Sequence, residues 1–316
     1  MHLRILASIS LLLAGPVGAQ TNDQPGIRLG KKVVQKWQFG CEVKAQGGIC
    51  RGILVTLPVP MDWPEQTVKL VDQKKTRNVT RLRFKKLVGA KQLTVSIPRL
   101  GANDSAKVVL TYEITKRLIS GPLKTDAFQQ AKLTARLRRY LRPSPKIESR
   151  DPRIIKAAKR VPFKKTGAWK QVESIYDWVR ENVKYKFDKK LQGAITALET
   201  GQGDCEELTS LFVAICRVKK IPARSVWIPG HCYPEFYLQD KQGKGHWIPC
   251  QSAGARYFGA MPEDRPVLQK GDRFKVPGQR KPHRYLRATL QARQAVQPPK
   301  LVWIQRKVEA AGKDKR

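Results

Sequence analysis

The sequence predicts an α+β protein in which an N-terminal antiparallel β-sandwich precedes a core with a helix packed on an antiparallel sheet. Residues 31–117 alternate apolar and polar side chains between closely spaced turn residues, which is typical of sandwich strands. From residue 145 onward, apolar side chains recur with helical spacing and then give way to three strand-like runs. Hydrophobic residues make up 41% of the 316-residue chain, which is enough to fill two modest cores.

Residues 1–19 are typical of a secretory signal peptide. Arg4 supplies a positive start, residues 5–14 form a short apolar run, and residues 17–19 (Val-Gly-Ala) are the small side chains that precede cleavage. We therefore expect cleavage near Ala19 and a secreted or periplasmic protein, with a buried N-terminal helix as the alternative. The run is shorter than the roughly 20 residues of a membrane span, and we expect no transmembrane segment later in the chain.

The expected sandwich, residues 31–117, shows two clear alternating runs. Their buried positions are Leu93, Val95 and Ile97 in one run, and Val108, Leu110, Tyr112 and Ile114 in the other. Turn residues at 47–48, 58–64 and 101–104 separate the strands. Nothing in this unit resembles a catalytic site.

Six cysteines are present, and export would allow disulfides to persist. Cys41 and Cys50 flank Gly47 and Gly48 in a segment that resembles a hairpin, so we expect a disulfide between them. No two cysteines have the spacing of a zinc site, so we expect no structural metal.

The chain is strongly basic, with 62 Lys and Arg against 25 Asp and Glu and a formal net charge of +37. Such a surface attracts polyanions by releasing counterions. An exported protein meets acidic polysaccharide, lipopolysaccharide or anionic lipid first, so an anionic cell-envelope polymer is a candidate partner. No motif favours specific nucleic-acid binding. A merely solvated basic surface is the alternative.

Residues 145–275 form the expected core. Asp151 and Pro152 are favourable residues for a helix start, and apolar side chains at three- and four-residue spacing predict a helix over residues 168–183. Two further helices and three strands follow, at 194–200, 205–219, 223–228, 231–238 and 245–251. Residues 276–316 are predicted to be a basic C-terminal extension that is poor in structure signals and partly disordered.

Cys205 begins the second of these two helices. Asp204 is a favourable N-cap and Glu207 follows three residues later, so this segment resembles a capping box. The dipole and free N–H groups of a helix start favour the reactive thiolate, and they can also hold an oxyanion. Because nearby carboxylates oppose ionisation, a histidine partner is needed to activate the thiol. A structural cysteine at a helix cap is the alternative.

Four histidines could serve as that partner: His2, His231, His246 and His283. His2 leaves with the signal peptide, and His283 lies in the basic C-terminal region. His246 is expected to be an exposed turn residue. His231 begins the strand after the one that follows the Cys205 helix, so it is the candidate base, with a buried core histidine as the alternative.

These residues resemble a known family. Residues 203–207 (Gly-Asp-Cys-Glu-Glu) and 221–224 (Ile-Pro-Ala-Arg) are similar to the bacterial transglutaminase-like motif around its nucleophile. Residues 230–237 resemble the histidine strand of that family, and residues 247–249 (Trp-Ile-Pro) resemble the approach to its third catalytic residue. The resemblance covers roughly residues 145–260 and implies a transglutaminase-like, papain-like cysteine fold.

By position, the resemblance implies Cys205 as nucleophile, His231 as base and Gln251 as third member. The family usually has Asp at this third position. The Gln251 amide oxygen would accept the Nδ1–H of His231 and hold the ring tautomer, but it cannot stabilise an imidazolium by charge. Papain-like enzymes use a neutral Asn there.

The pairing of the strands that carry His231 and Gln251 predicts where two other cysteines lie. If His231 faces Gln251 across two antiparallel strands, Cys232 faces Cys250 on the opposite side of the sheet. They would then form a disulfide or a buried thiol pair, unless a bulge at Gly243 shifts the register.

Together these observations predict an exported thiol enzyme that acts on amide bonds through a Cys205 thioester, without a cofactor or metal. Simple exported members of the family favour peptide or amide hydrolysis. Protein-glutamine transamidation by the same site is one alternative. A catalytically inactive cell-envelope module that binds polyanions, marked by Gln251, is the other.

Overall fold

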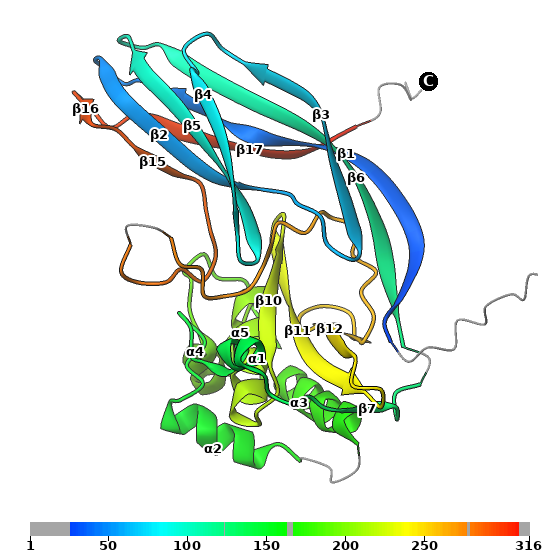
Figure 1. Cartoon of the computed structure of the whole chain (residues 1–316). Helices are drawn as coiled ribbons and strands as arrows, with labels where there is room; N and C mark the ends of the chain where they lie inside the picture. Colours follow the sequence, from blue (N-terminus) through cyan, green and yellow to red (C-terminus); the bar gives the residue numbers. More distant parts are fainter. Residues whose placement is uncertain (1–25, 123, 163–166, 277–278, 310–316) are drawn as a thin grey trace, which may run out of the picture.

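The computed structural model describes residues 26–122, 124–162, 167–276 and 279–309. Here the chain forms an antiparallel β-sandwich above a core of helices and sheet (Figure 1), which confirms the predicted α+β class. No helix in these ranges has the length and apolar character needed to cross a membrane. The predicted signal peptide lies outside the described residues.

Six strands between residues 28 and 121 form most of the sandwich. They are β1 (Arg28–Lys44), β2 (Cys50–Val59), β3 (Gln66–Lys75), β4 (Arg81–Leu87), β5 (Ala90–Leu100) and β6 (Ser105–Gly121). β1, β6 and β3 lie in one sheet, and β2, β5 and β4 lie in the other. Alternate side chains of both sheets meet in a shared core, where Phe39, Val55 and Leu110 are fully buried. Burying one such side chain stabilises the fold by about 1.5–3 kcal/mol.

The C-terminal segment completes this sandwich, so the prediction of an extension poor in structure is wrong for residues 289–308. β15 (Thr289–Gln291) and β16 (Gln294–Ala295) pair with β2, and β17 (Lys300–Val308) pairs with β1 along its whole length. Leu301 lies opposite Val43 and packs against the sandwich core. Partners more than two hundred residues away in sequence stabilise these strands, and a local pattern cannot reveal them.

The predicted disulfide between Cys41 and Cys50 is also wrong. All six cysteines lie in the described part of the chain, and all are free. Cys41 belongs to β1 and Cys50 to β2, and these strands lie in different sheets instead of pairing as a hairpin. Both side chains are buried, and burial raises the pKa of Cys41 to about 12.

The lower unit places helices against an antiparallel sheet. Its helices are α1 (Ala135–Arg138), the 3-10 turn η1 (Arg139–Leu141), α2 (Pro152–Arg160), α3 (Ala168–Asn182), α4 (Ala194–Thr200) and α5 (Cys205–Val218). Its strands are β7 (Phe128–Gln130), β8 (Lys184–Tyr185), β9 (Gln202–Gly203), β10 (Ala223–Ile228), β11 (His231–Asp240), β12 (Gly245–Gln251), β13 (Tyr257–Phe258) and β14 (Gln269–Lys270). The predicted elements from residue 194 to residue 251 are all present.

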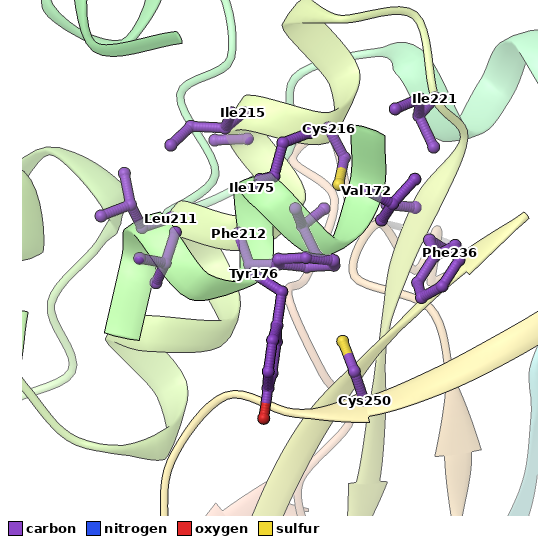
Figure 2. Close-up of a cluster of buried hydrophobic side chains, with 14 of the residues drawn as sticks. Val172, Ile175, Tyr176, Leu211, Phe212, Ile215, Cys216, Ile221, Phe236 and Cys250 are labelled. Atoms are coloured by element: carbon purple, nitrogen blue, oxygen red, sulfur yellow. The ribbon is translucent and has the colours of Figure 1, made fainter. Parts of the chain in front are cut away.

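Helices α3 and α5 form the centre of this unit with strands β11 and β12. Tyr176 and Phe212 meet edge to face, and Phe212 does the same with Phe236 on β11 (Figure 2). The thiols of Cys216 and Cys250 lie in the same cluster, and burial raises their pKa values well above the usual range. These two cysteines are therefore core side chains.

The β11–β12 register differs from the predicted one by two residues. Glu235 lies opposite Pro249, so Cys232 and Cys250 are not opposed and do not form the predicted pair. The reason is the turn between the strands. Asp240 accepts hydrogen bonds from the N–H groups of Gln242 and Lys244, and the turn is centred one residue further along the chain than the predicted register requires.

His246 also differs from its prediction as an exposed turn residue. Its ring Nε2 lies 2.8 Å from a carboxylate oxygen of Asp240, and its side chain is only 10% exposed. The pair stabilises the turn between β11 and β12. In the described part of the chain, His246 makes no contact with Cys205.

Strand β14 joins the two units. It pairs with β10 of the lower unit and with β5 of the sandwich, so one sheet runs through both. Beside it, the buried Lys270 ammonium lies 2.6 Å from carboxylates of both Glu65 and Glu235. Removing one partner from a buried ion pair costs about 3–5 kcal/mol, so this contact holds the sandwich at a defined place over the lower unit.

Candidate active site

Cys205 occupies the first turn of α5, and the local sequence determines this start. The Asp204 carboxylate accepts the N–H of Glu206 at 2.7 Å, and the Glu207 carboxylate accepts the N–H of Asp204 at 3.1 Å. A side chain at Gly203 would place its Cβ 2.5 Å from the Glu207 Cβ, so only glycine fits there. The predicted capping box is therefore present.

His231 and Gln251 come together beside this helix start. The Nε2 atom of His231 lies 3.1 Å from the amide oxygen of Gln251. Backbone contacts hold Gln251, because its carbonyl oxygen accepts hydrogen bonds from the Tyr176 hydroxyl at 2.8 Å and from Arg180 at 3.1 Å. The prediction that Nδ1 would face Gln251 is wrong. The ring presents Nε2 to Gln251, which leaves Nδ1 for the Cys205 thiol.

The surroundings of Cys205 lower the pKa of its thiol to about 5. The largest cause is a hydrogen bond from the Cys232 thiol, and the hydrogen bond and positive charge of His231 add to it, against the opposing effect of burial. A helix start stabilises a nearby negative charge by up to about 2 kcal/mol, which corresponds to about 1.5 on the pKa scale. The side-chain partners are therefore needed for a shift from 9.0 to about 5.

The same contact raises the pKa of His231. Burial alone would lower it, but the hydrogen bond and charge of Cys205 and the Gln251 oxygen more than offset that effect. Because the thiol titrates near pH 5 and the imidazole above 6.5, thiolate and imidazolium coexist between these values. This is the activated form of a cysteine–histidine pair.

Cys232 also lies at this site, although the sequence predicts it opposite Cys250. It follows His231 on β11, and its sulfur lies 3.4 Å from the Cys205 carbonyl oxygen and 3.8 Å from the Thr209 hydroxyl. Burial, followed by the nearby Cys205 sulfur, raises the pKa of Cys232 well above its usual range. The thiol therefore stays protonated and can donate to the Cys205 thiolate.

Cys205 and His231 face a cleft of about 350 Å³ that both units line. Cys205 and His231 lie on its floor, and β17 of the sandwich supplies Trp303 and Gln305 to its wall. Further aromatic side chains complete the lining: Tyr185, Phe187, Trp227 and Tyr285. Trp303 is 38% exposed and Phe187 is 67% exposed, so the cleft presents apolar surface to solvent.

The model of the transglutaminase-like superfamily matches residues 155–252, a segment that contains Cys205, His231 and Gln251. Residues 155–252 are a transglutaminase-like core. No curated protein sequence matches the chain. Among the described residues, no group of three or more His, Cys, Asp or Glu is arranged to hold a metal ion.

A solved structure extends the likeness beyond the transglutaminase-like core. A candidate cysteine protease from Cytophaga hutchinsonii has 14% sequence identity and a TM-score of 0.57, over 90% of this chain and 94% of that one. The shared fold therefore includes the sandwich. The periplasmic domain of TgpA from Pseudomonas aeruginosa, bound to ethylmercury, has 14% identity and a TM-score of 0.33, over 72% of this chain and 90% of that one.

Replacing Cys232 tests its role as a thiol donor. Cys232→Ala removes the donor, and a hydrogen bond to a charged group contributes about 1.5–3 kcal/mol, so the pKa of Cys205 should rise by about one to two. Cys232→Ser keeps a donor and should change it less. Thiolate absorbance in the ultraviolet across pH measures both. Equal titration of Cys205 in all three proteins would show that Cys232 is only a packing residue.

Replacing Gln251 tests whether it orients His231. Gln251→Ala removes an acceptor that raises the pKa of His231, so activity should fall by at least about tenfold, equivalent to about 1.4 kcal/mol, and the alkaline limit should move to lower pH. Gln251→Asp adds a negative charge, so activity should be kept or raised and the alkaline limit should move to higher pH. Gln242→Ala, in the exposed β11–β12 turn, is the matched control. Identical profiles for all four proteins would remove Gln251 from the site.

Proposed function

We propose that this chain is an exported thiol hydrolase that cleaves peptide or amide bonds through a thioester on Cys205. The observation that carries the proposal is the meeting of Cys205, His231 and Gln251 at a capped helix start, with Cys205 and His231 facing a cleft. The apolar and aromatic cleft lining supports an extended peptide as substrate. The pattern of residues 1–19 supports export.

The first half of the reaction is acyl transfer to the enzyme. The Cys205 thiolate attacks the carbonyl carbon, and the backbone N–H of Cys205, which has no acceptor within the helix, can donate to the developing oxyanion. Collapse of this intermediate breaks the C–N bond. The His231 imidazolium gives its proton to the departing amine, and a Cys205 thioester remains.

The second half releases the acyl group. Neutral His231 takes a proton from a water molecule, which attacks the thioester carbonyl. The carboxylic acid leaves, and the Cys205 thiolate and His231 imidazolium are restored. An amine in place of water would give transamidation by the same steps. Gln251 keeps the ring oriented through both halves by its contact with Nε2.

Product analysis tests the proposal and separates its alternatives. The mature protein is incubated with a peptide mixture and a primary-amine tracer, and mass spectrometry follows new termini, tracer incorporation and mass added to Cys205. We expect new termini and a thioester on Cys205. Cys205→Ser should lower cleavage by about 10⁴-fold or more.

Two results would contradict hydrolysis. Tracer incorporation at glutamine without new termini would identify a transamidase. No product and no thioester at any pH between 5 and 8, with folded protein, would identify a catalytically inactive module.

A further inference from the structure

A second cavity, of about 560 Å³, lies where the sandwich meets the lower unit. Its walls are the end of β4 with the turn that follows it, the turn η1, and residues 270–275 after β14. None of the proposed catalytic residues lines it. The cavity is therefore separate from the proposed site of hydrolysis.

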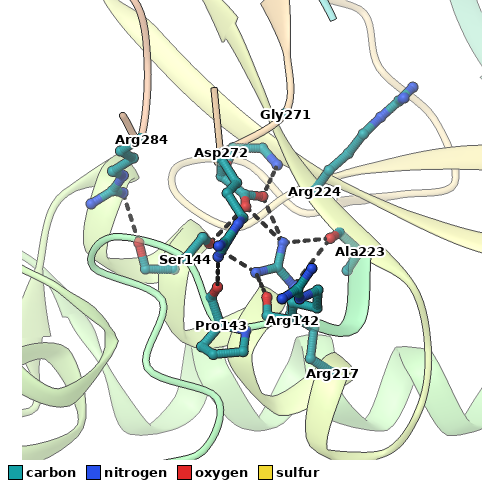
Figure 3. A network of polar contacts seen from close by, with 12 residues as sticks. Arg142, Pro143, Ser144, Arg217, Ala223, Arg224, Gly271, Asp272 and Arg284 are labelled. Atoms are coloured by element: carbon teal, nitrogen blue, oxygen red, sulfur yellow. Dashed lines mark hydrogen bonds and ion pairs between the residues drawn. The ribbon is translucent and has the colours of Figure 1, made fainter. Parts of the chain in front are cut away.

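The floor of this cavity is electrically balanced. Asp272 accepts two hydrogen bonds from the Arg217 guanidinium, at 2.8 and 2.7 Å, and another from Ser144 at 2.7 Å (Figure 3). Below it, Lys270 and Arg224 share the carboxylate of Glu235.

Lys270 also binds Glu65. Three cations thus face three carboxylates, and the floor has no acidic group left to attract a further positive charge.

The rim, in contrast, carries five positive side chains. They are Lys86, Arg139, Arg142, Arg273 and Lys275. In the described part of the chain, none of the five forms an ion pair with a carboxylate, whereas the surface elsewhere holds pairs such as Lys44 with Glu42. Like charges around one cavity repel each other and lower the stability of the fold, unless a ligand of opposite charge neutralises them.

The rim is also held in place before any ligand arrives. Arg217 donates to the Arg142 carbonyl oxygen at 2.8 Å, and Arg273 donates to the Pro143 carbonyl oxygen at 3.0 Å. The floor network therefore anchors the backbone that presents Arg142. A site arranged in advance loses less entropy when it binds a ligand.

The remaining lining is apolar and aromatic. Tyr140 lines the cavity with the Arg139 guanidinium 5.3 Å from its ring centre, and Leu87 and Val88 also line it. Arginine binds carboxylates through paired, parallel hydrogen bonds, and an aromatic face can pack against the C–H groups of a sugar ring. The cavity volume lies in the usual range for sites of small ligands.

We propose that this cavity binds an acidic oligosaccharide, with its carboxylates on the rim arginines and lysines and one sugar ring against Tyr140. The site would attach the protein to an anionic glycan while the cleft at Cys205 stays free. The proposal does not depend on the proposed hydrolysis, because binding can be measured without turnover.

The test compares two triple variants that lose the same charge. The rim triple removes three rim cations by the substitutions Arg139→Gln, Arg142→Gln and Lys275→Gln. The control triple removes three exposed cations from sandwich strands outside the cavity, by the substitutions Lys69→Gln, Arg83→Gln and Lys307→Gln. Calorimetry with the mature protein measures the affinity for oligogalacturonate, and circular dichroism checks that all variants are folded.

We expect oligogalacturonate to bind the unmodified protein and a neutral glucose oligomer of equal length not to bind. The rim triple should weaken binding by at least about tenfold more than the control triple. The slope of log affinity against log salt concentration should be smaller in magnitude by about three for the rim triple. Each rim cation that contacts the polyanion releases about one counterion from it.

Other outcomes would overturn the proposal. Equal loss in both triples would mean attraction by overall charge alone. Displacement of the oligosaccharide by inorganic phosphate at equal concentration would identify a simple anion site. Failure to bind oligogalacturonate, with rim-dependent binding to phosphatidylglycerol vesicles, would identify a lipid headgroup as the ligand.

Discussion

Cys205 lies at the start of α5, and the hydrogen bonds that begin this helix set the geometry of the whole site. Asp204 and Glu207 satisfy N–H groups that would otherwise have no partner. These contacts fix Cys205 as the first residue of the helix. A shift of that start by one residue would rotate the sulfur by about 100° around the helix axis. The sulfur would then leave both His231 and Cys232. The geometry of the site therefore depends on a capping interaction, and the capping residue Asp204 also lines the cleft.

The second structural requirement is the joint between the two units. β14 continues the sheet of the lower unit into the sandwich, and separation of the two units would leave the buried carboxylate of Glu65 without its Lys270 partner. As a result, Trp303 on β17 lines the cleft of Cys205 although nearly a hundred residues separate them. The sandwich is thus part of the site as well as a neighbouring unit. The same joint also creates the cationic cavity.

Local sequence was sufficient where local interactions decide the structure. The capping box, the helix at Cys205 and the strand that begins at His231 were all predictable, because their signals lie within a few residues of each other. Gln251 was predicted near His231, but the ring nitrogen that faces it was not, since ring orientation depends on how β12 is held by Tyr176 and Arg180.

Long-range pairing limited the remaining predictions. The Cys41–Cys50 segment has the residues of a hairpin, yet it crosses between sheets because β1 pairs with β6 and β17. The loop at Asp240 changed the β11–β12 register, and with it the expected partner of Cys232. Cys232 instead lies beside Cys205, where its thiol has the largest effect on the pKa of the Cys205 thiol. Short polar strands such as β15 and β16 are stable only because β2 is already in place.

Alkylation of the six cysteines by iodoacetamide across pH, mapped by mass spectrometry on folded protein, tests the central claim most directly. An activated Cys205 should be labelled selectively below about pH 7, with the rate rising through a midpoint near 5, while the five buried thiols react only after unfolding. Labelling of Cys205 that begins only near pH 8.5, at the rate of a free thiol, would contradict the account.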